Sequence, residues 1–359
     1  MSYKFLIYIS YSYAVPIGNP LEHYILNRGD QIMWFSDLED GRHKLQNKSN
    51  ILESIADVIN YKPDIVFAAT DDVPDFISGL KVQIFHGFFA QKRPESNNKF
   101  AHFRIRGFFD LYCTQGPTTT NGFKMQQKKH PHFEVIETGW SKVDPLFPLV
   151  TKKSVSLHHI MIASTFTKRL SLAYNDDVFQ EIKRLSKKGT YNFSMVLHPK
   201  LPQELKLKWQ SLNGKHFTYH DTTDLIPLFK KADIMFADTT SAIQEFLLQK
   251  KPVVTYNHTF NHNYLINITN PQRIEDAFAQ ALSNPEQLIT QINTFINQLH
   301  PYFDGKSSQR VVESSINYLH TNKSYLKSKP LNLIRKYKIR KRLGYFTLKS
   351  YSKPYTVVL

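Results

Sequence analysis

The sequence predicts an α/β protein with two Rossmann-like, doubly wound domains that face each other across a cleft. Short apolar runs alternate with longer amphipathic segments, which is the pattern of βα units that build parallel sheets. The 359 residues exceed one typical domain of roughly 150 residues, and 41% hydrophobic residues suffice for a large core. Because open parallel sheets bind ligands beyond the carboxyl ends of their strands, we expect the ligand in the cleft.

The first series of elements predicts a domain over residues 1–150. A strand is expected at 4–10, and the helix that follows it over 20–29 ends at Gly29. The other expected elements of this domain are strands at 31–36, 63–69, 82–87 and 109–114 and a helix over 50–61.

A second series predicts a domain of the same kind over residues 151–322. It begins with a strand at 158–164 and ends with helices that fill about 273–319. Between these we expect strands at 193–198, 233–238 and 252–257 and helices over 178–188, 225–232 and 242–249.

The C-terminal segment, residues 323–359, is strongly basic. The whole chain carries 46 basic and 30 acidic residues, whereas residues 314–359 hold 11 basic residues and no acidic one. Leu, Ile, Tyr and Phe alternate there with Lys and Arg, which suits the surface of an anionic membrane. A nucleic acid or a merely solvated tail would accept the same composition. Of the three interpretations we favour a membrane-associating tail and regard nucleic acid as the weakest.

Composition also limits the compartment and the cofactors. Cys113 is the single cysteine, and no apolar run reaches the roughly 18 residues of a membrane span, so we expect a cytoplasmic protein on the inner face of the membrane. His258 and His262 are four residues apart, but their segment is rich in Asn and reads as a loop. We expect no metal there, and the missing GxGxxG and P-loop motifs argue against NAD and ATP.

Polar residues fall at the carboxyl ends of several predicted strands. His86 and Gly87 follow one strand, His198 follows another, and the run from Asp238 to Ser241 follows a third. The segment 304–310 forms a polar turn before a helix. Each has an ordinary explanation, because histidines form local hydrogen bonds and Ser or Thr caps helices. Their repetition at one edge favours a binding site, and three adjacent hydroxyls suit a phosphate better than a cap.

Five motifs in this order resemble the CDP-glycerol glycerophosphotransferase family, the teichoic-acid primases and polymerases built on the GT-B fold. They are HGFFAQK (86–92), GWSKVDPLF (139–147), LHPK (197–200), DTTSAIQEF (238–246) and DGKSSQRV (304–311). The resemblance implies a transferase that moves glycerol phosphate, or another polyol phosphate, from a CDP-activated donor to an acceptor hydroxyl and releases CMP. It implies no cofactor besides the cytidine-nucleotide donor, and an acceptor that is a polysaccharide or is lipid-linked in surface-polymer or capsule synthesis.

The resemblance also implies roles for single residues. His86 is our candidate general base, since an imidazole titrates near neutral pH. His198 is expected to stabilise the negative charge on the leaving group. The residues expected to bind the donor phosphates are Asp238, Thr239, Thr240, Ser241, Ser307 and Arg310. Other residues expected in the cleft are Gly87, Lys92, Gly139, Lys142, Asp144, Lys200, Glu245 and Asp304.

Departures from the family pattern leave alternatives open. Phe88 and Phe89 follow the first His-Gly pair, where the family usually has Thr and Pro. Gly139 is followed by Trp140 and Ser141, where the family tends to have an aromatic residue and then Pro. A related GT-B glycosyltransferase using a CMP-activated sugar, such as Kdo or sialic acid, is the main alternative. Sugar-nucleotide epimerases share the predicted architecture, and a basic binding module without catalysis is the non-enzyme alternative.

Overall fold

The computed structural model describes residues 2–88, 103–149 and 157–355. The chain divides into two compact units. Unit 1 comprises residues 1–87, 100–148 and 299–359, and unit 2 comprises residues 88–99 and 149–298. Lys92 of the HGFFAQK motif lies outside the described residues.

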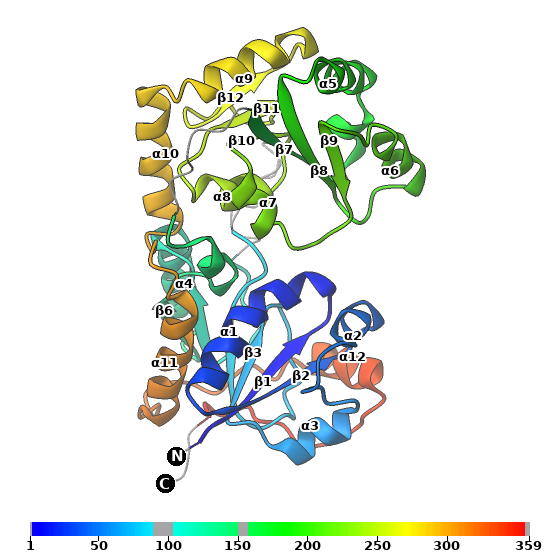
Figure 1. The fold of residues 1–359 in the computed structure, drawn as a ribbon. Helices are drawn as coiled ribbons and strands as arrows, with labels where there is room; N and C mark the ends of the chain where they lie inside the picture. The colour runs from blue at the N-terminus through cyan, green and yellow to red at the C-terminus, as the bar shows by residue number, and fades with distance from the viewer. Residues whose placement is uncertain (1, 89–102, 150–156, 356–359) are drawn as a thin grey trace. The chain divides into compact units, whose positions relative to one another are not determined.

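Unit 1 is built on a six-stranded parallel sheet with the strand order β2-β1-β3-β4-β5-β6 (Figure 1). The chain first extends the sheet from β1 to β2 and then returns to the other side of β1 with β3. The strands are β1 (Lys4–Ile9), β2 (Gln31–Ser36), β3 (Ile65–Ala68), β4 (Leu80–Gln83), β5 (Leu111–Thr114) and β6 (Glu134–Glu137). Ligands of such sheets bind where the winding direction changes, which is here between β1 and β3.

Helices flank this sheet and come from all three parts of unit 1. They are η1 (Ser12–Ala14), α1 (Val15–Asn27), α2 (Glu39–Leu45), α3 (Ile55–Tyr61), α4 (Pro117–Lys129), η2 (Ser141–Leu146), α11 (Ser307–His320) and α12 (Leu333–Leu343). Local sequence explains individual ends: Ser54 and Asp57 form a capping box at the start of α3. The core is rich in aromatic side chains, among them Tyr112, Phe123 and Phe133.

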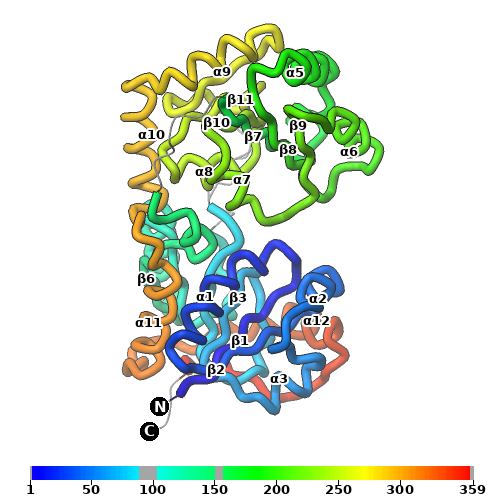
Figure 2. The backbone as a smooth tube through the Cα atoms, in the orientation of Figure 1, coloured from blue at the N-terminus to red at the C-terminus, as the bar shows by residue number. Residues whose placement is uncertain are grey.

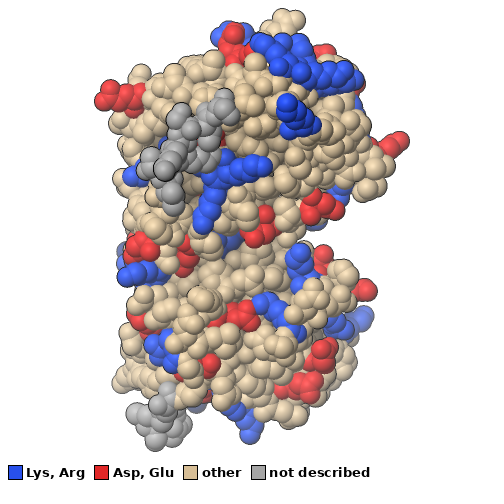
Figure 3. Space-filling model, viewed as in Figure 1, with Lys and Arg blue, Asp and Glu red and all other residues tan. Residues whose placement is uncertain are grey.

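Unit 2 has a second six-stranded parallel sheet, with the order β12-β11-β10-β7-β8-β9. Its strands are β7 (His158–Ser164), β8 (Tyr191–Leu197), β9 (Phe217–His220), β10 (Ile234–Ala237), β11 (Val253–Tyr256) and β12 (Ile266–Ile268). Its helices are η3 (Lys168–Leu170), η4 (Leu172–Tyr174), α5 (Asp176–Lys188), α6 (Gln203–Gln210), α7 (Ile226–Lys231), α8 (Ala242–Leu247), η5 (Pro271–Arg273), α9 (Ile274–Leu282) and α10 (Glu286–Leu299). On the face shown in Figure 3, basic side chains gather over α5, whereas basic and acidic side chains are interspersed elsewhere.

The division of the chain differs from the sequence prediction after residue 298. We expected residues 299–322 in the second domain, but they belong to unit 1. The physical reason is that α11 packs beside α1, where the Tyr24 hydroxyl donates a hydrogen bond to Glu313 at 2.7 Å. The polar turn 304–310 is therefore the start of a unit 1 helix and does not follow a strand of unit 2.

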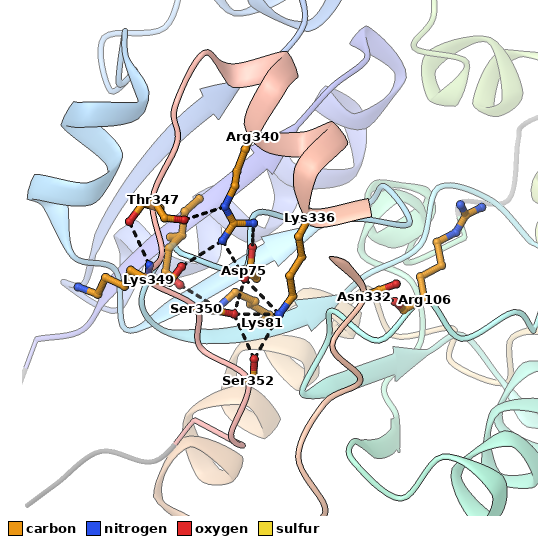
Figure 4. Close-up of polar contacts among 11 residues, drawn as sticks. Asp75, Lys81, Arg106, Asn332, Lys336, Arg340, Thr347, Lys349, Ser350 and Ser352 are labelled. Carbon is orange, nitrogen blue, oxygen red and sulfur yellow. Dashed lines mark hydrogen bonds and ion pairs between the residues drawn. The ribbon is translucent and has the colours of Figure 1, made fainter. Parts of the chain in front are cut away.

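The C-terminal segment is also part of unit 1 and lies beside its first elements (Figure 2). Ile339 of α12 is 2% exposed within the unit 1 core, and Lys329 forms a buried ion pair with Asp110 at 2.7 Å. Arg340 and Lys336 of α12 both reach Asp75 (Figure 4). These contacts make the segment a structural part of unit 1, where the sequence predicted a separate tail.

No helix within residues 2–88, 103–149 and 157–355 combines the length and the apolar composition that a membrane span requires.

Candidate active site

His86 lies just beyond the carboxyl end of β4, and its side chain is exposed. Its Nδ1 lies 3.2 Å from the carbonyl oxygen of Ala69, just after β3. Because a carbonyl oxygen only accepts hydrogen bonds, Nδ1 of the neutral ring carries the proton and Nε2 keeps its lone pair. This is the form in which a histidine acts as a general base.

The backbone on both sides of His86 is held by side chains from other elements. Phe85 has a φ of 58°, a left-handed value that is strained for a bulky residue. The Trp140 indole N–H donates to the Phe85 carbonyl at 3.3 Å, and the Gln115 side-chain amide donates to the Gly87 carbonyl at 2.9 Å. Trp140 and Gln115 therefore position the candidate base.

Asp144 caps the first turn of α11. Its carboxylate accepts hydrogen bonds from the backbone N–H groups of Ser307, at 2.9 Å, and Ser308, at 2.6 Å, and from the Ser308 hydroxyl at 2.6 Å. Burial raises the pKa of Asp144, although the hydrogen bonds from the two serines oppose this. The predicted phosphate role of Ser307 is not supported, because the Asp144 carboxylate occupies its backbone N–H and its hydroxyl lies 3.5 Å from Nε2 of His300.

Gly139 allows the chain to pass close to this helix start. It has a φ of 82°, and a Cβ at this position would lie 2.4 Å from the Ser307 hydroxyl oxygen. The next residue, Trp140, donates its backbone N–H to Nε2 of His300 at 3.0 Å. Burial lowers the pKa of His300 to about 4, so this ring is neutral. Lys142 is half-buried, with its ammonium group 5.2 Å from the Trp140 ring.

Arg310, on the first turn of α11, forms an ion pair with Asp304, which precedes the helix. One nitrogen of its guanidinium lies 3.2 Å from Asp304, and the group lies 4.3 Å from the centre of the Tyr302 ring. Arg310 belongs to unit 1, whereas the predicted hydroxyl cluster belongs to unit 2.

In unit 2, Asp238 holds the ends of two neighbouring strands together. It follows β10, is fully buried, and accepts hydrogen bonds from the Ser164 hydroxyl at 2.5 Å and the backbone N–H groups of Thr165 and Leu172 at 2.9 and 3.0 Å. The sequence predicted a phosphate-binding role, but a buried carboxylate with these donors cannot bind an anion directly. Asp238 instead positions the loop after β7.

The three hydroxyls after Asp238 lie at the start of α8. Thr239 is 3% exposed, and its hydroxyl has no hydrogen-bond partner among the described residues. Thr240 accepts only a long hydrogen bond from the Ala242 backbone at 3.4 Å, and Ser241 makes no side-chain capping bond. These hydroxyls are therefore not used for capping as the ordinary explanation requires. Glu245, one turn later, is buried.

His198 follows β8 and has the opposite hydrogen-bond arrangement to His86. Its Nδ1 accepts a hydrogen bond from the backbone N–H of Lys200 at 3.2 Å, so Nε2 carries the proton of the neutral ring. The His198 ring packs on the Phe166 ring, with centroids 4.6 Å apart. The ammonium group of the exposed Lys200 lies 5.4 Å from the centre of the Phe166 ring. A protonated Nε2 and a lysine ammonium group that pack on the same phenylalanine suit an anionic group. Phe166, which the sequence interpretation missed, supports both residues.

His258 and His262 lie after β11, with ring centroids 5.3 Å apart. Burial lowers the pKa of both rings. Within the described part of the chain, no three His, Cys, Asp or Glu side chains are grouped as a metal site.

The predicted site residues thus fall into two groups. Unit 2 carries His198, Lys200, Asp238, Thr239, Thr240, Ser241 and Glu245. Unit 1 carries His86, Gly87, Gly139, Lys142, Asp144, Asp304, Ser307 and Arg310. Each unit therefore presents polar residues at the carboxyl ends of its parallel strands, which defines an α/β enzyme of the GT-B type.

The chain belongs to the CDP-glycerol:poly(glycerophosphate) glycerophosphotransferase family. The family model matches residues 125–316, which is more than half of the chain. This range contains four of the five motifs and leaves out His86 and α12. The protein is accordingly a glycerophosphotransferase.

Solved structures share the fold at low sequence identity. The wall teichoic acid polymerase TagF matches with a TM-score of 0.59 and 12% identity over 89% of this chain and 90% of that one. The UDP-GlcNAc 2-epimerase from Neisseria meningitidis, bound to UDP-GlcNAc, matches with a TM-score of 0.59 and 16% identity, over 88% of this chain and 100% of that one. MnaA from S. aureus, in a structure with UDP, matches with a TM-score of 0.59 and 17% identity, over 89% of this chain and 97% of that one. None of the curated proteins compared with this sequence matches it.

Proposed function

We propose that the protein transfers glycerol phosphate from CDP-glycerol to an acceptor hydroxyl and releases CMP. The family supports the class of reaction. A structure of TagF soaked with CDPG, at 13% identity, shows that another enzyme with this fold was studied with such a donor. By this likeness, the product would be a teichoic-acid-like or capsule polymer of the cell surface.

The observation that carries this proposal is the opposite contact that Nδ1 makes in the two histidines: a carbonyl oxygen at His86 and a backbone N–H at His198. In the neutral rings this leaves the lone pair on Nε2 of His86 and the proton on Nε2 of His198. The acceptor hydroxyl gives its proton to His86 as its oxygen attacks the β-phosphorus of the donor. The bond from that phosphorus to the CMP oxygen breaks, and the products are a phosphodiester and CMP. His198 donates a hydrogen bond to the departing phosphate.

On the donor side we assign phosphate contacts to Thr239, Thr240 and Ser241, together with Lys200. Hydrogen bonds to charged oxygens contribute on the order of 1.5–3 kcal/mol each, and the Thr239 hydroxyl has no other described partner. Because α8 has only six residues, the hydroxyls and not a helix dipole are the basis of this assignment.

A comparison of donors tests the reaction. The enzyme should release CMP from CDP-glycerol in the presence of acceptor, and should leave CMP-Kdo and CMP-sialic acid intact. CMP release from a CMP-sugar alone would replace the proposal with a glycosyltransferase. Release from none of these donors would contradict both activities.

We further propose that the protein works at the inner face of the cell membrane, in the cytoplasm, and docks through α12 and the loop after it. One side of this segment is attached to unit 1, as Ile339 and Arg340 show. Its other side exposes large apolar side chains, each more than half accessible: Leu331, Leu333, Ile334, Tyr337, Phe346 and Leu348.

Exposed basic residues accompany this apolar surface, namely Arg335, Lys338, Lys341 and Lys349. Each contributes about 1 kcal/mol near an anionic lipid surface. The double variant Leu333→Ser/Ile334→Ser should lose sedimentation with phosphatidylglycerol vesicles, while Leu207→Ser, which changes an exposed leucine of unit 2, should not. Equal sedimentation of the two variants would refute docking through this surface.

A further inference from the structure

Two hollows of unit 1 meet at His86. The first has a volume of 180 Å³ and the second 330 Å³, and His86 and Asp71 line both. Residues that follow β1, β3 and β4 form their walls. The second hollow thus lies at the change of winding direction between β1 and β3, where open parallel sheets bind ligands, and the first adjoins it on the side of β4 and β5.

The first hollow contains an unsatisfied polar group. Gln83 lines it, is 2% exposed, and has no hydrogen-bond partner for its side-chain oxygen among the described residues. Aromatic side chains, among them Phe109 and Phe123, form much of the remaining wall. A buried amide oxygen of this kind is stabilised when a ligand donates a hydroxyl hydrogen bond to it.

The second hollow presents an aromatic surface beside His86. The rings of Tyr11 and Tyr13 stack with centroids 5.5 Å apart, and the Tyr13 ring centre lies 5.8 Å from that of His86. Both tyrosines are partly exposed, at 45% and 37%. Aromatic faces of this kind pack against the C–H faces of sugar rings through dispersion and apolar burial.

The cations of the second hollow are already paired. Arg106 lies 2.7 Å from Asp71, and Arg342 lies 2.6 Å from Asp37 and 3.5 Å from Asp72. Burial, Tyr11 and neighbouring carboxylates raise the pKa of Tyr13 to about 12, which agrees with a lining that has no positive excess.

The first hollow adds one exposed cation, Arg104, to a lining that also contains the shared Asp71. The three arginines that line the two hollows are thus balanced by two lining carboxylates, Asp71 and Asp72, and by Asp37, which pairs with Arg342. A chain of phosphodiesters would need surplus cations to offset its charge, and the described residues that line these hollows do not provide them.

We infer that the two hollows bind the terminal sugar of a neutral glycan acceptor, rather than a poly(glycerol phosphate) chain, and present its hydroxyl to Nε2 of His86. The inference rests on the proposed function, because it takes His86 as the base. Arg342 comes from α12, so the membrane-facing segment also completes the acceptor site.

Binding without any donor tests the inference separately from the reaction. Saturation-transfer NMR should detect binding of at least one methyl glycoside among those of glucose, galactose, N-acetylglucosamine and N-acetylmannosamine. A synthetic glycerol phosphate trimer should bind at least tenfold more weakly. Stronger binding of the trimer, or binding of no probe, would overturn the inference. Glycoside binding by a protein that releases no CMP from CDP-glycerol would instead contradict the proposed function alone.

Two variants and a control identify the surface. Tyr13→Ala and Gln83→Leu should each lower glycoside affinity by roughly tenfold, whereas Tyr325→Ala, an exposed tyrosine outside both hollows, should not. Gln83→Leu should also preserve or raise the thermal midpoint, because it removes a buried unsatisfied oxygen. Unchanged glycoside affinity in both variants would show that the hollows are not the site.

Discussion

The attachment of the C-terminal segment to unit 1 predicts that one substitution at Asp75 weakens the whole unit. Asp75 accepts hydrogen bonds from Arg340 at 2.8 and 3.2 Å and from the Ser350 hydroxyl at 2.5 Å (Figure 4). The Lys336 ammonium group lies 3.3 Å away. Burial would raise the pKa of Asp75, but the hydrogen bonds from Arg340 and Ser350 and the two cations outweigh it and lower the pKa.

Asp75→Asn keeps the side-chain shape and removes the charge, so two largely buried cations lose their counter-ion. The side chains of Asp75, Lys336 and Arg340 are 6%, 11% and 11% exposed. Removing one partner of a buried pair costs roughly 3–5 kcal/mol. Because the asparagine keeps one side-chain oxygen that can accept hydrogen bonds, we expect a loss at the lower end of this range, about 3 kcal/mol, in the free energy of unfolding. That is a large share of the free energy of unfolding of a typical protein, which is roughly 5–15 kcal/mol.

Urea unfolding followed by tryptophan fluorescence measures this loss, and trypsin cleavage within residues 327–353 reports release of the segment. Asp276→Asn is the matched control, because Asp276 pairs with Arg273 at the surface, where both side chains are about 70% exposed. The control should change the free energy of unfolding by less than about 0.5 kcal/mol. A loss for Asp75→Asn within 1 kcal/mol of the control, with unchanged trypsin cleavage, would refute the reasoning.

Three further predictions concern the site. Trp140→Phe removes the hydrogen bond to the Phe85 carbonyl and should lower kcat about tenfold with KM for CDP-glycerol unchanged; an equal rise in KM would exclude a positioning role. Thr239→Val should weaken CMP binding, measured by calorimetry, about tenfold without loss of stability, and unchanged affinity would remove Thr239 from the donor site. The pKa of His300, lowered to about 4 in the folded state and about 6.5 when unfolded, means that the unfolded chain binds more protons between these values. Stability should therefore fall as pH drops from 6.5 to 4, and His300→Gln should flatten this decline; an unchanged pH profile would contradict it.

Much of the fold follows from the sequence because parallel strands are continuous apolar runs. KFLIYI and HHIMIAS form β1 and β7 within one residue of their expected bounds. By contrast, β6 has the sequence EVIE, whose two glutamates conceal a strand at the sheet edge. The helix expected over 20–29 begins earlier, at Val15, because Pro16 suits the first turn of a helix, where no N–H is needed. Pro20 lies inside α1, so it does not mark the start of the helix as the sequence suggested.

The candidate site was less predictable, because sequence order does not reveal which unit a late segment joins. The DGKSSQRV motif contains the start of α11, which folds back onto unit 1, so Arg310 and Ser307 are not in the unit of Thr239. Asp238 and Asp144 carry the right residue type, but the structure uses their carboxylates to hold backbone N–H groups. Arg342 had no signal beyond the basic run, since only tertiary packing brings it to the hollow that His86 lines.

The central claim is that one neutral imidazole removes the acceptor proton, and His86→Ala measures it most directly. CMP release from CDP-glycerol in the presence of acceptor should fall by 10²-fold or more, in the range expected for loss of a general base. The dissociation constant of CDP-glycerol should stay within threefold of the unsubstituted protein. A variant that turns over normally, or one whose rate falls only because it no longer binds the donor, would contradict the account.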